Sequence, residues 1–175
     1  MAGVFMIKIL SPILFAFFIS PLWPLGPNPL PGDPFVIVNK TTNEMALIDE
    51  NKVQTVVSVG TGKTKELTPE GLFTITIKAQ DPYYRRKDIP GGDPNNPLGS
   101  RWIGFDAQGT DGRIYGIHGT NQPASIGRYV SQGCIRTQNE VISSLYPLIP
   151  LGTKILVTST NKSFEQLAKD NGAIQ

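Results

Sequence analysis

The sequence predicts one mostly β domain over residues 35–160, with one or two short helices. Short runs rich in Val, Ile and Thr recur along the chain, and turn-forming Asn, Gly and Asp residues separate them. The run GLFTITIKA (71–79) alternates apolar and polar residues, which is the period of a half-buried strand. A length of 175 residues fits one such domain with an extension at either end.

Seven strands are expected, and the first three are predicted to form a meander. The seven are FVIVNK (35–40), EMALID (44–49), KVQTVVSVG (52–60), the alternating run 71–79, RWIGFDA (101–107), RIYGIHG (113–119) and TKILVTST (153–160). The fifth and sixth are joined by the turn signal QGTDG, so we expect them to pair.

Two segments carry weak helical signals. In 137–149, Val141, Leu145 and Leu148 have helical spacing, and Thr137 is a suitable N-cap. Residues 161–175 form a polar C-terminal tail with room for one or two helical turns. We find no internal repeat.

Residues 80–100 have no period and are dense in Gly, Pro, Asn and Asp. A loop this long inside a compact domain is more often a lid or a binding loop than a passive connection. We therefore expect Tyr83, Tyr84, Arg85 and Arg86 to face a substrate, although a solvated charged loop explains the same residues.

The N-terminus is typical of an exported protein. Residues 1–20 carry Lys8 and then an apolar run from Ile9 to Ile19, which has the shape of a signal peptide core and is short for a spanning helix. An uncleaved membrane anchor is the alternative, and Pro12 argues against a buried core helix. Residues 21–34 follow as a Pro-rich linker. We expect the protein to be secreted, in the cell wall, or anchored on the outer side of the cytoplasmic membrane, with membrane contact only through residues 1–20.

Composition excludes several classes of function. Sixteen basic and fourteen acidic residues give a net charge of +2, and no basic stripe with interleaved aromatics predicts nucleic-acid binding. One Cys allows no internal disulfide, and one His with one Cys cannot fill a zinc site. A lone Cys in an exported protein is a free reactive thiol or a partner for another chain.

The only His and the only Cys lie close together in the segment IYGIHGTNQPASIGRYVSQGCIR (114–136). A nucleophilic thiol needs a base or a lowered pKa, and His118 can supply the base for Cys134. We expect Cys134 in a loop that opens a helix, where the helix dipole favours the thiolate. Gly133 permits a tight turn whose N–H groups can bind an oxyanion. Each residue alone is more often structural, since free Cys is commonly buried as a small apolar group.

The segment resembles the catalytic domain of the L,D-transpeptidase (YkuD) family. The matching residues are His118, Gly119, Ser131, Gly133, Cys134 and Arg136. The opening strands and the segment TPEGLFTI (68–75) are similar too, so the resemblance covers residues 35–158. Many members have His where this chain has Gln132, which leaves His118 as the only candidate base. The resemblance implies an L,D-transpeptidase-like β-sandwich or barrel.

The resemblance also implies a two-step acyl transfer on peptidoglycan stem peptides. Cys134 attacks the bond between the diamino acid and the terminal D-Ala, and His118 moves the proton. The acyl group then passes to the side-chain amine of a second stem, which crosslinks the cell wall. Gly119 and Gly133 are the candidate orienting and oxyanion residues. No cofactor or metal is required, and carbapenem-type inhibitors are expected to add to the Cys.

Three residues are candidates for substrate binding: Arg136, Ser131 and Tyr115. The Arg136 guanidinium can pair with a stem carboxylate, with a turn-capping surface Arg as the alternative. Ser131 either bonds near the nucleophile or holds the turn.

Two other functions remain open from the sequence. The same site can hydrolyse the bond as an L,D-carboxypeptidase, or the fold can serve as a non-catalytic peptidoglycan-binding domain. The intact His118 and Cys134 argue against the binding domain, which needs neither. A papain-like protease is disfavoured because there the Cys precedes the His.

Overall fold

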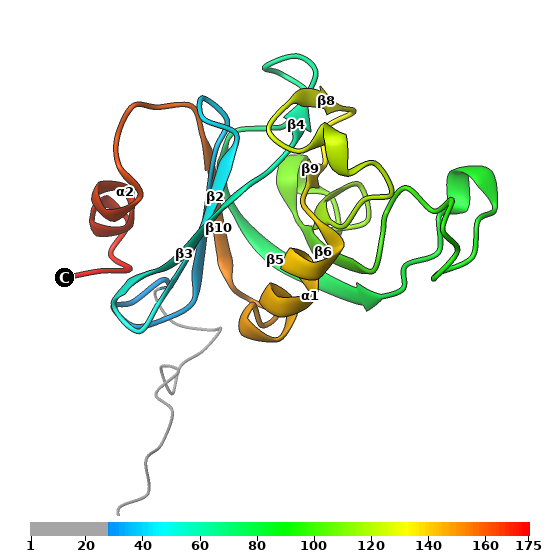
Figure 1. Cartoon of the computed structure of the whole chain (residues 1–175). Helices are drawn as coiled ribbons and strands as arrows, with labels where there is room; N and C mark the ends of the chain where they lie inside the picture. Colours follow the sequence, from blue (N-terminus) through cyan, green and yellow to red (C-terminus); the bar gives the residue numbers. More distant parts are fainter. Residues whose placement is uncertain (1–27) are drawn as a thin grey trace, which may run out of the picture.

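The computed structural model describes residues 28–175, which form a curled mixed sheet with two short helices (Figure 1). The strands are β1 (Phe35–Asn39), β2 (Glu44–Asp49), β3 (Lys52–Ser58), β4 (Thr61–Gly62), β5 (Gly71–Gln80), β6 (Arg101–Phe105), β7 (Tyr115–His118), β8 (Tyr129–Ser131), β9 (Ile135–Arg136) and β10 (Lys154–Thr158). The α-helices are α1 (Asn139–Leu145) and α2 (Phe164–Asp170), and 3-10 helices span Arg85–Lys87, Ala107–Gly109, Pro123–Ser125 and Tyr146–Leu148. The mostly β prediction is confirmed.

Eight strands form the main sheet in the order β3-β2-β1-β10-β5-β6-β7-β9, and β4 pairs with β8 in a separate ribbon. The first and last strands of the domain, β1 and β10, lie side by side and parallel. The predicted pairing of β6 with β7 is confirmed and is antiparallel. The short strands β4, β8 and β9 were not predicted.

Strand β5 joins the two halves of the sheet. Its first residues pair with β10 and its later residues pair with β6, with a register shift between Ile75 and Ile77. An irregularity of this kind bends a strand and increases its twist. The sheet therefore curls, so that β6, β7 and β9 face a different direction from β1 and β2 (Figure 1).

Strand β1 is buried on both faces, which explains its unbroken apolar sequence. Because side chains alternate along a strand, Phe35 and Ile37 face one hydrophobic cluster while Val36 and Val38 face the other. The larger cluster also contains Ile75, Ile103, Phe105, Ile117, Ile135, Ile142 and Ile155. It lies between the two halves of the sheet and α1.

The C-terminal segment covers the other face of β1. The sequence predicts a polar tail here. In the structure, four of its residues are buried against Phe35 and Ile37: Leu167, Ala168, Ala173 and Ile174. Ser163 caps helix α2 by accepting a hydrogen bond from the Gln166 N–H. The tail is thus a packed layer of the fold, on the opposite side of the sheet from α1 (Figure 1).

Helix α1 differs from its predicted form. It begins after Gln138, with no side-chain cap, and the hydroxyl of Thr137 has no hydrogen-bond partner within residues 28–175, so Thr137 is not the N-cap. Ile142 and Leu145 are its buried residues, whereas Leu148 is exposed on the 3-10 helix that follows. The helix ends before Pro147 because proline cannot continue it.

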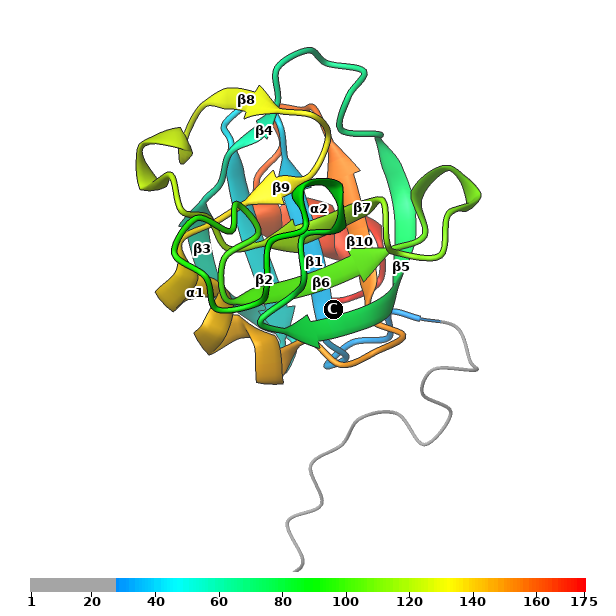
Figure 2. The ribbon, with the colours of Figure 1, turned by 90° about the vertical axis from the view of Figure 1, so that its right-hand side faces the viewer.

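The loop 81–100 projects from the sheet on the side away from α2, and it lies in front of β6, β7 and β9 in Figure 2. The loop joins β5 to β6, and β6 pairs with β7, the strand that ends at His118. The predicted signal or anchor (1–20) lies outside the described residues. None of the helices within residues 28–175 is long and apolar enough to cross a membrane.

Candidate active site

The candidate site lies on β7 and just before β9, which are neighbouring parallel strands. His118 pairs with Arg136, and Ile117 pairs with Ile135. Because side chains at paired positions share a face and alternate along a strand, His118, Arg136 and Cys134 project from the face opposite the two isoleucines. Ile117 and Ile135 are fully buried and anchor both strands in the core.

His118 is held by a backbone carbonyl and an aromatic ring. Its Nδ1 lies 2.5 Å from the Gly119 carbonyl oxygen, which assigns the proton to Nδ1 and leaves Nε2 unprotonated. The Trp102 ring stacks on the imidazole with centroids 5.6 Å apart. The side chain is 4% exposed. The predicted orienting role of Gly119 is consistent with this contact.

Cys134 ends a tight turn formed by residues 131–134. Its side chain is partly exposed, and its Sγ donates a hydrogen bond to the Ile114 carbonyl at 3.4 Å. The prediction that Cys134 opens a helix is wrong: strand β9 follows it directly, and α1 starts only at Asn139. No helix N-terminus therefore lies directly after this thiol.

Burial determines the protonation states of the pair. The pKa of His118 is lowered to about 4, chiefly by burial and also by the charge of Arg136, against hydrogen bonds to the Gly119 and Leu98 backbones. Burial raises the pKa of the Cys134 thiol, although a hydrogen bond from the Gly116 backbone and the charges of Arg136 and Arg86 act in the opposite direction. At neutral pH these shifts leave the pair as a thiol and a neutral imidazole.

Both side chains open into one cavity of about 890 Å³. Its lining includes Tyr83, Tyr84, Arg85, Arg86, Trp102, Arg113, Tyr115, His118, Ser131, Gln132, Cys134 and Arg136. The long loop thus forms one wall, as the sequence predicts, and the sheet forms the floor. A cavity of this size accommodates a short peptide segment.

The family model named YkuD, L,D-transpeptidase catalytic domain, matches residues 33–157. This chain belongs to the L,D-transpeptidase (YkuD) family.

Relatives and solved structures of the family agree with this assignment. "Putative L,D-transpeptidase YqjB" from Bacillus subtilis (strain 168) is 63% identical over 156 residues, covering 89% of this chain and 89% of that one. The crystal structure of a mutant Enterococcus faecium L,D-transpeptidase superposes with a TM-score of 0.57 at 22% identity, covering 73% of this chain and 50% of that chain. L,D-transpeptidase 3 from Mycobacterium tuberculosis, solved with a faropenem-derived adduct, gives a TM-score of 0.57 at 17% identity, covering 73% of this chain and 61% of that chain. At these identities the two structures support the fold.

In this L,D-transpeptidase domain, Ser131 holds the turn that carries Cys134. Its hydroxyl donates to the Cys134 carbonyl at 2.6 Å and accepts from the Gly133 N–H at 3.0 Å, and the residue is 1% exposed. The hydroxyl is therefore used inside the turn rather than offered to a substrate. The Gly133 N–H is also occupied, which leaves the Cys134 N–H as the candidate oxyanion donor.

Arg136 has donor capacity to spare. Its Nε is buried and has no partner within the described part of the chain, and Nη1 makes only a long contact of 3.4 Å to Gln122 Oε1. A partly buried guanidinium whose Nε has no partner within the described residues is suited to a carboxylate ligand. Tyr115, the third substrate-binding candidate, lines the cavity, but its hydroxyl donates to Gln108 Oε1 at 2.8 Å.

Two residues that support His118 were missed from the sequence. The indole of Trp102 lies over Gly116, where an added Cβ would approach it to 2.6 Å, and its Nε1 donates to the Gly112 carbonyl at 2.9 Å. Asn139 accepts hydrogen bonds from the Ser100 N–H at 3.1 Å and the Thr120 N–H at 3.2 Å, so it joins the end of the long loop to the segment after His118. The sequence signal for this packing is one glycine in each strand, Gly104 in β6 and Gly116 in β7, which pair with each other.

No group of three or more His, Cys, Asp or Glu side chains within residues 28–175 is arranged to hold a metal ion.

Proposed function

We propose that this chain is a peptidoglycan L,D-transpeptidase in which Cys134 is the nucleophile and His118 the general base. The observation that carries the proposal is the placement of the two side chains in one cavity, with the Nδ1 of His118 tied to the Gly119 carbonyl. With the proton on Nδ1, the Nε2 lone pair is the only hydrogen-bond acceptor of the imidazole ring. Family membership supplies the class of reaction.

The reaction follows from this arrangement. Cys134 Sγ attacks the carbonyl between the diamino acid and the terminal D-Ala while His118 Nε2 takes the thiol proton. The C–N bond breaks, D-Ala leaves with that proton, and a thioester remains on Cys134. The side-chain amine of a second stem then attacks the thioester, forms the new amide and releases the thiol. The Cys134 N–H binds the oxyanion in both steps.

The charge of the cavity favours an anionic donor. Arg85, Arg86, Arg113 and Arg136 line it, against Asp111 as the acidic residue of the lining. Stem peptides carry several carboxylates, which pair with guanidinium groups in a planar bidentate fashion. We assign Arg136, with its unpaired Nε, to a stem carboxylate. The loop residues Tyr83, Tyr84, Arg85 and Arg86 cover the donor as a lid.

Penem and carbapenem inhibitors should react at the same position. The M. tuberculosis relative in the comparison carries a faropenem-derived adduct. We propose that such compounds acylate Cys134 here. The signal-like run at residues 1–20 supports action outside the cytoplasmic membrane, where the polymer lies.

Intact-protein mass spectrometry of the full chain with a disaccharide-tetrapeptide, with and without a diamino-acid acceptor, tests the proposal. The expected result is a thioester mapped to Cys134 and a product that contains the acceptor, both absent in Cys134→Ala. Release of tripeptide and D-Ala without acceptor incorporation would instead assign L,D-carboxypeptidase activity. An adduct on another residue, or none, would overturn the catalytic assignment in favour of a binding domain.

A further inference from the structure

The loop 63–70, between β4 and β5, packs against the turn that carries the nucleophile. Thr68 in this loop is fully buried. Its Oγ1 accepts a hydrogen bond from the Gly62 N–H at 2.9 Å and donates one to the Gly133 carbonyl at 3.0 Å. The hydroxyl therefore joins the loop to the residue immediately before Cys134.

The same loop determines the backbone conformation of Gly133. The backbone φ of this residue is +132°, a value that residues other than glycine rarely adopt. A Cβ added here would lie 2.4 Å from the Leu67 carbonyl oxygen. The close approach of two backbones leaves no room for the turn to shift towards the loop. The Thr68 hydroxyl then fixes the rotation of the Gly133 carbonyl within that space.

The orientation of this carbonyl determines the orientation of the Cys134 N–H. The peptide between Gly133 and Cys134 is planar and trans, so its N–H points opposite to its C=O. Ser131 already uses the Gly133 N–H and the Cys134 carbonyl, which fixes the turn on its other side. Thr68 is the only side chain within the described residues that bonds to the carbonyl of this peptide.

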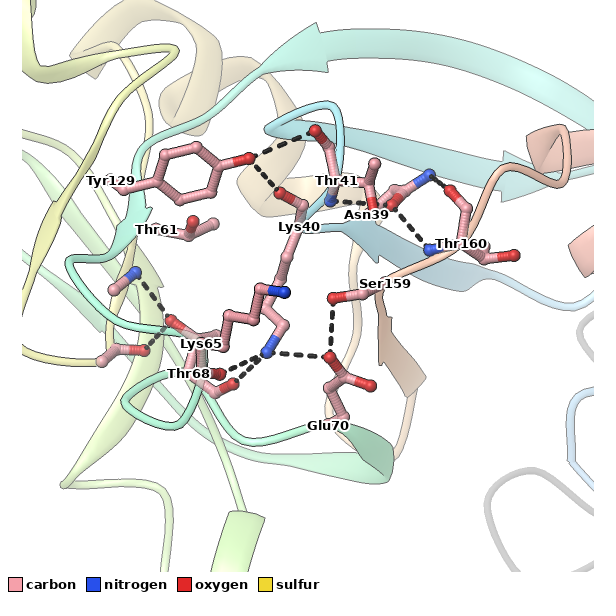
Figure 3. Close-up of polar contacts among 12 residues, drawn as sticks. Asn39, Lys40, Thr41, Thr61, Lys65, Thr68, Glu70, Tyr129, Ser159 and Thr160 are labelled. Atoms are coloured by element: carbon pink, nitrogen blue, oxygen red, sulfur yellow. Dashed lines mark hydrogen bonds and ion pairs between the residues drawn. The ribbon is translucent and has the colours of Figure 1, made fainter.

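A buried lysine anchors the loop to the core. Lys40, at the end of β1, is 6% exposed, and its Nζ donates to the Lys65 carbonyl at 2.6 Å and the Thr68 carbonyl at 2.9 Å. It also pairs with Glu70 Oε1 at 3.0 Å, and Ser159 donates to the same oxygen at 2.6 Å. Figure 3 shows this side chain directed at the three groups. A buried ammonium so fully bonded gives the loop a fixed position.

We propose that Thr68 is a positioning residue for the acyl transfer, holding the Gly133–Cys134 peptide so that the Cys134 N–H is directed at the reacting carbonyl oxygen. The inference rests on the proposed chemistry at Cys134. It assigns to the loop 63–70 a role in the transition state, although Thr68 itself touches neither the thiol nor the substrate.

The test separates acylation from simple thiol reactivity. Acylation by faropenem develops an oxyanion, whereas alkylation by iodoacetamide displaces iodide at a saturated carbon and develops none. Thr68→Val should lower the acylation rate about 10- to 100-fold, which is less than the roughly 100- to 1,000-fold loss on removing an oxyanion donor, because the Cys134 N–H is still present but no longer held. The alkylation rate and its pH profile should be unchanged. Thr68→Ser, which keeps the hydroxyl, should acylate within about threefold of the wild-type rate.

Thr153→Val is the matched control. Thr153 is equally buried and its hydroxyl donates to the Pro150 carbonyl at 2.8 Å, but it lies outside the cavity. It should acylate normally. If Thr68→Val does not fold, Thr68→Ala removes the same hydroxyl without adding bulk.

Wild-type acylation by Thr68→Val or Thr68→Ala would overturn the inference, as would a parallel loss of alkylation, which would place the effect on the thiol. Failure of the wild-type protein itself to form the faropenem adduct would instead overturn the proposed function.

Discussion

Because His118 is buried, we predict that the free energy of unfolding depends on pH, which can be tested without a substrate. It is the only histidine of the chain, and burial lowers its pKa to about 4, whereas an unfolded histidine titrates near 6.5. Between those two pH values the unfolded chain binds a proton that the folded protein does not bind. Lowering the pH from about 6.5 therefore favours unfolding, and the effect levels off below about pH 4.

The magnitude follows from the difference between the two pKa values. A difference of about 2.5 units corresponds to a total loss of about 3.4 kcal/mol in the free energy of unfolding, reached below both values. Between pH 7 and pH 5 the loss is about 2 kcal/mol, because the unfolded chain is then nearly fully protonated at this position and the folded protein is not.

Urea denaturation of the wild type and of His118→Gln at pH 7, 6 and 5 checks this prediction. The carboxyl groups titrate alike in both proteins, so their contribution cancels in the difference between them. We expect the wild type to lose about 2 kcal/mol more than the variant across this range. Equal losses in the two proteins would refute the argument that His118 is buried in its neutral form.

Three further predictions concern the turn, the lid and the C-terminal layer. Gly133→Ala should cost about 1–3 kcal/mol of stability and abolish faropenem acylation, because the φ of +132° and the Leu67 carbonyl exclude a Cβ; normal acylation would show that the turn is free to move. Arg86→Gln should shift the pH profile of iodoacetamide alkylation to higher pH, since the Arg86 charge lowers the pKa of the Cys134 thiol; an unchanged profile would mean that the loop does not approach the thiol in solution. Leu167→Ala should cost about 2–4 kcal/mol in urea denaturation while the folded protein still acylates; a cost below about 0.5 kcal/mol would indicate that α2 does not pack on β1.

The strands were predictable because their signals are local. The unbroken apolar run of β1 and the alternating sequence of β5 are each contained within one strand, and the structure confirms a strand at both places. The strands β8 and β9 have three residues or fewer, which is too short for any period to register. Their existence depends on pairing with distant segments, as β9 does with β7.

The C-terminal layer shows a related limit. A strand that is apolar on both faces must be covered by other residues on each face. The apolar sequence of β1 therefore indicates that a second layer packs on it. Only Leu167 and Ala168 of α2 are buried, and the rest of the segment is mostly polar, so its composition predicts only a tail.

The active site divides in the same way. The sequence by itself determined which side chains can act, because one His, one Cys and the glycines beside them leave few assignments for a base and a nucleophile. It also suggested that a helix dipole would activate the thiol, and the structure shows β9 in that place.

Only the tertiary structure decided how these groups are tuned. The pKa directions of His118 and Cys134 come from burial, the orientation of the imidazole from Gly119 and Trp102, and the fixed peptide before the thiol from Thr68. Desolvation and hydrogen bonding depend on which atoms surround a group in space. Thr68 and Gly133 are 65 positions apart in the chain, and no local pattern records that they touch.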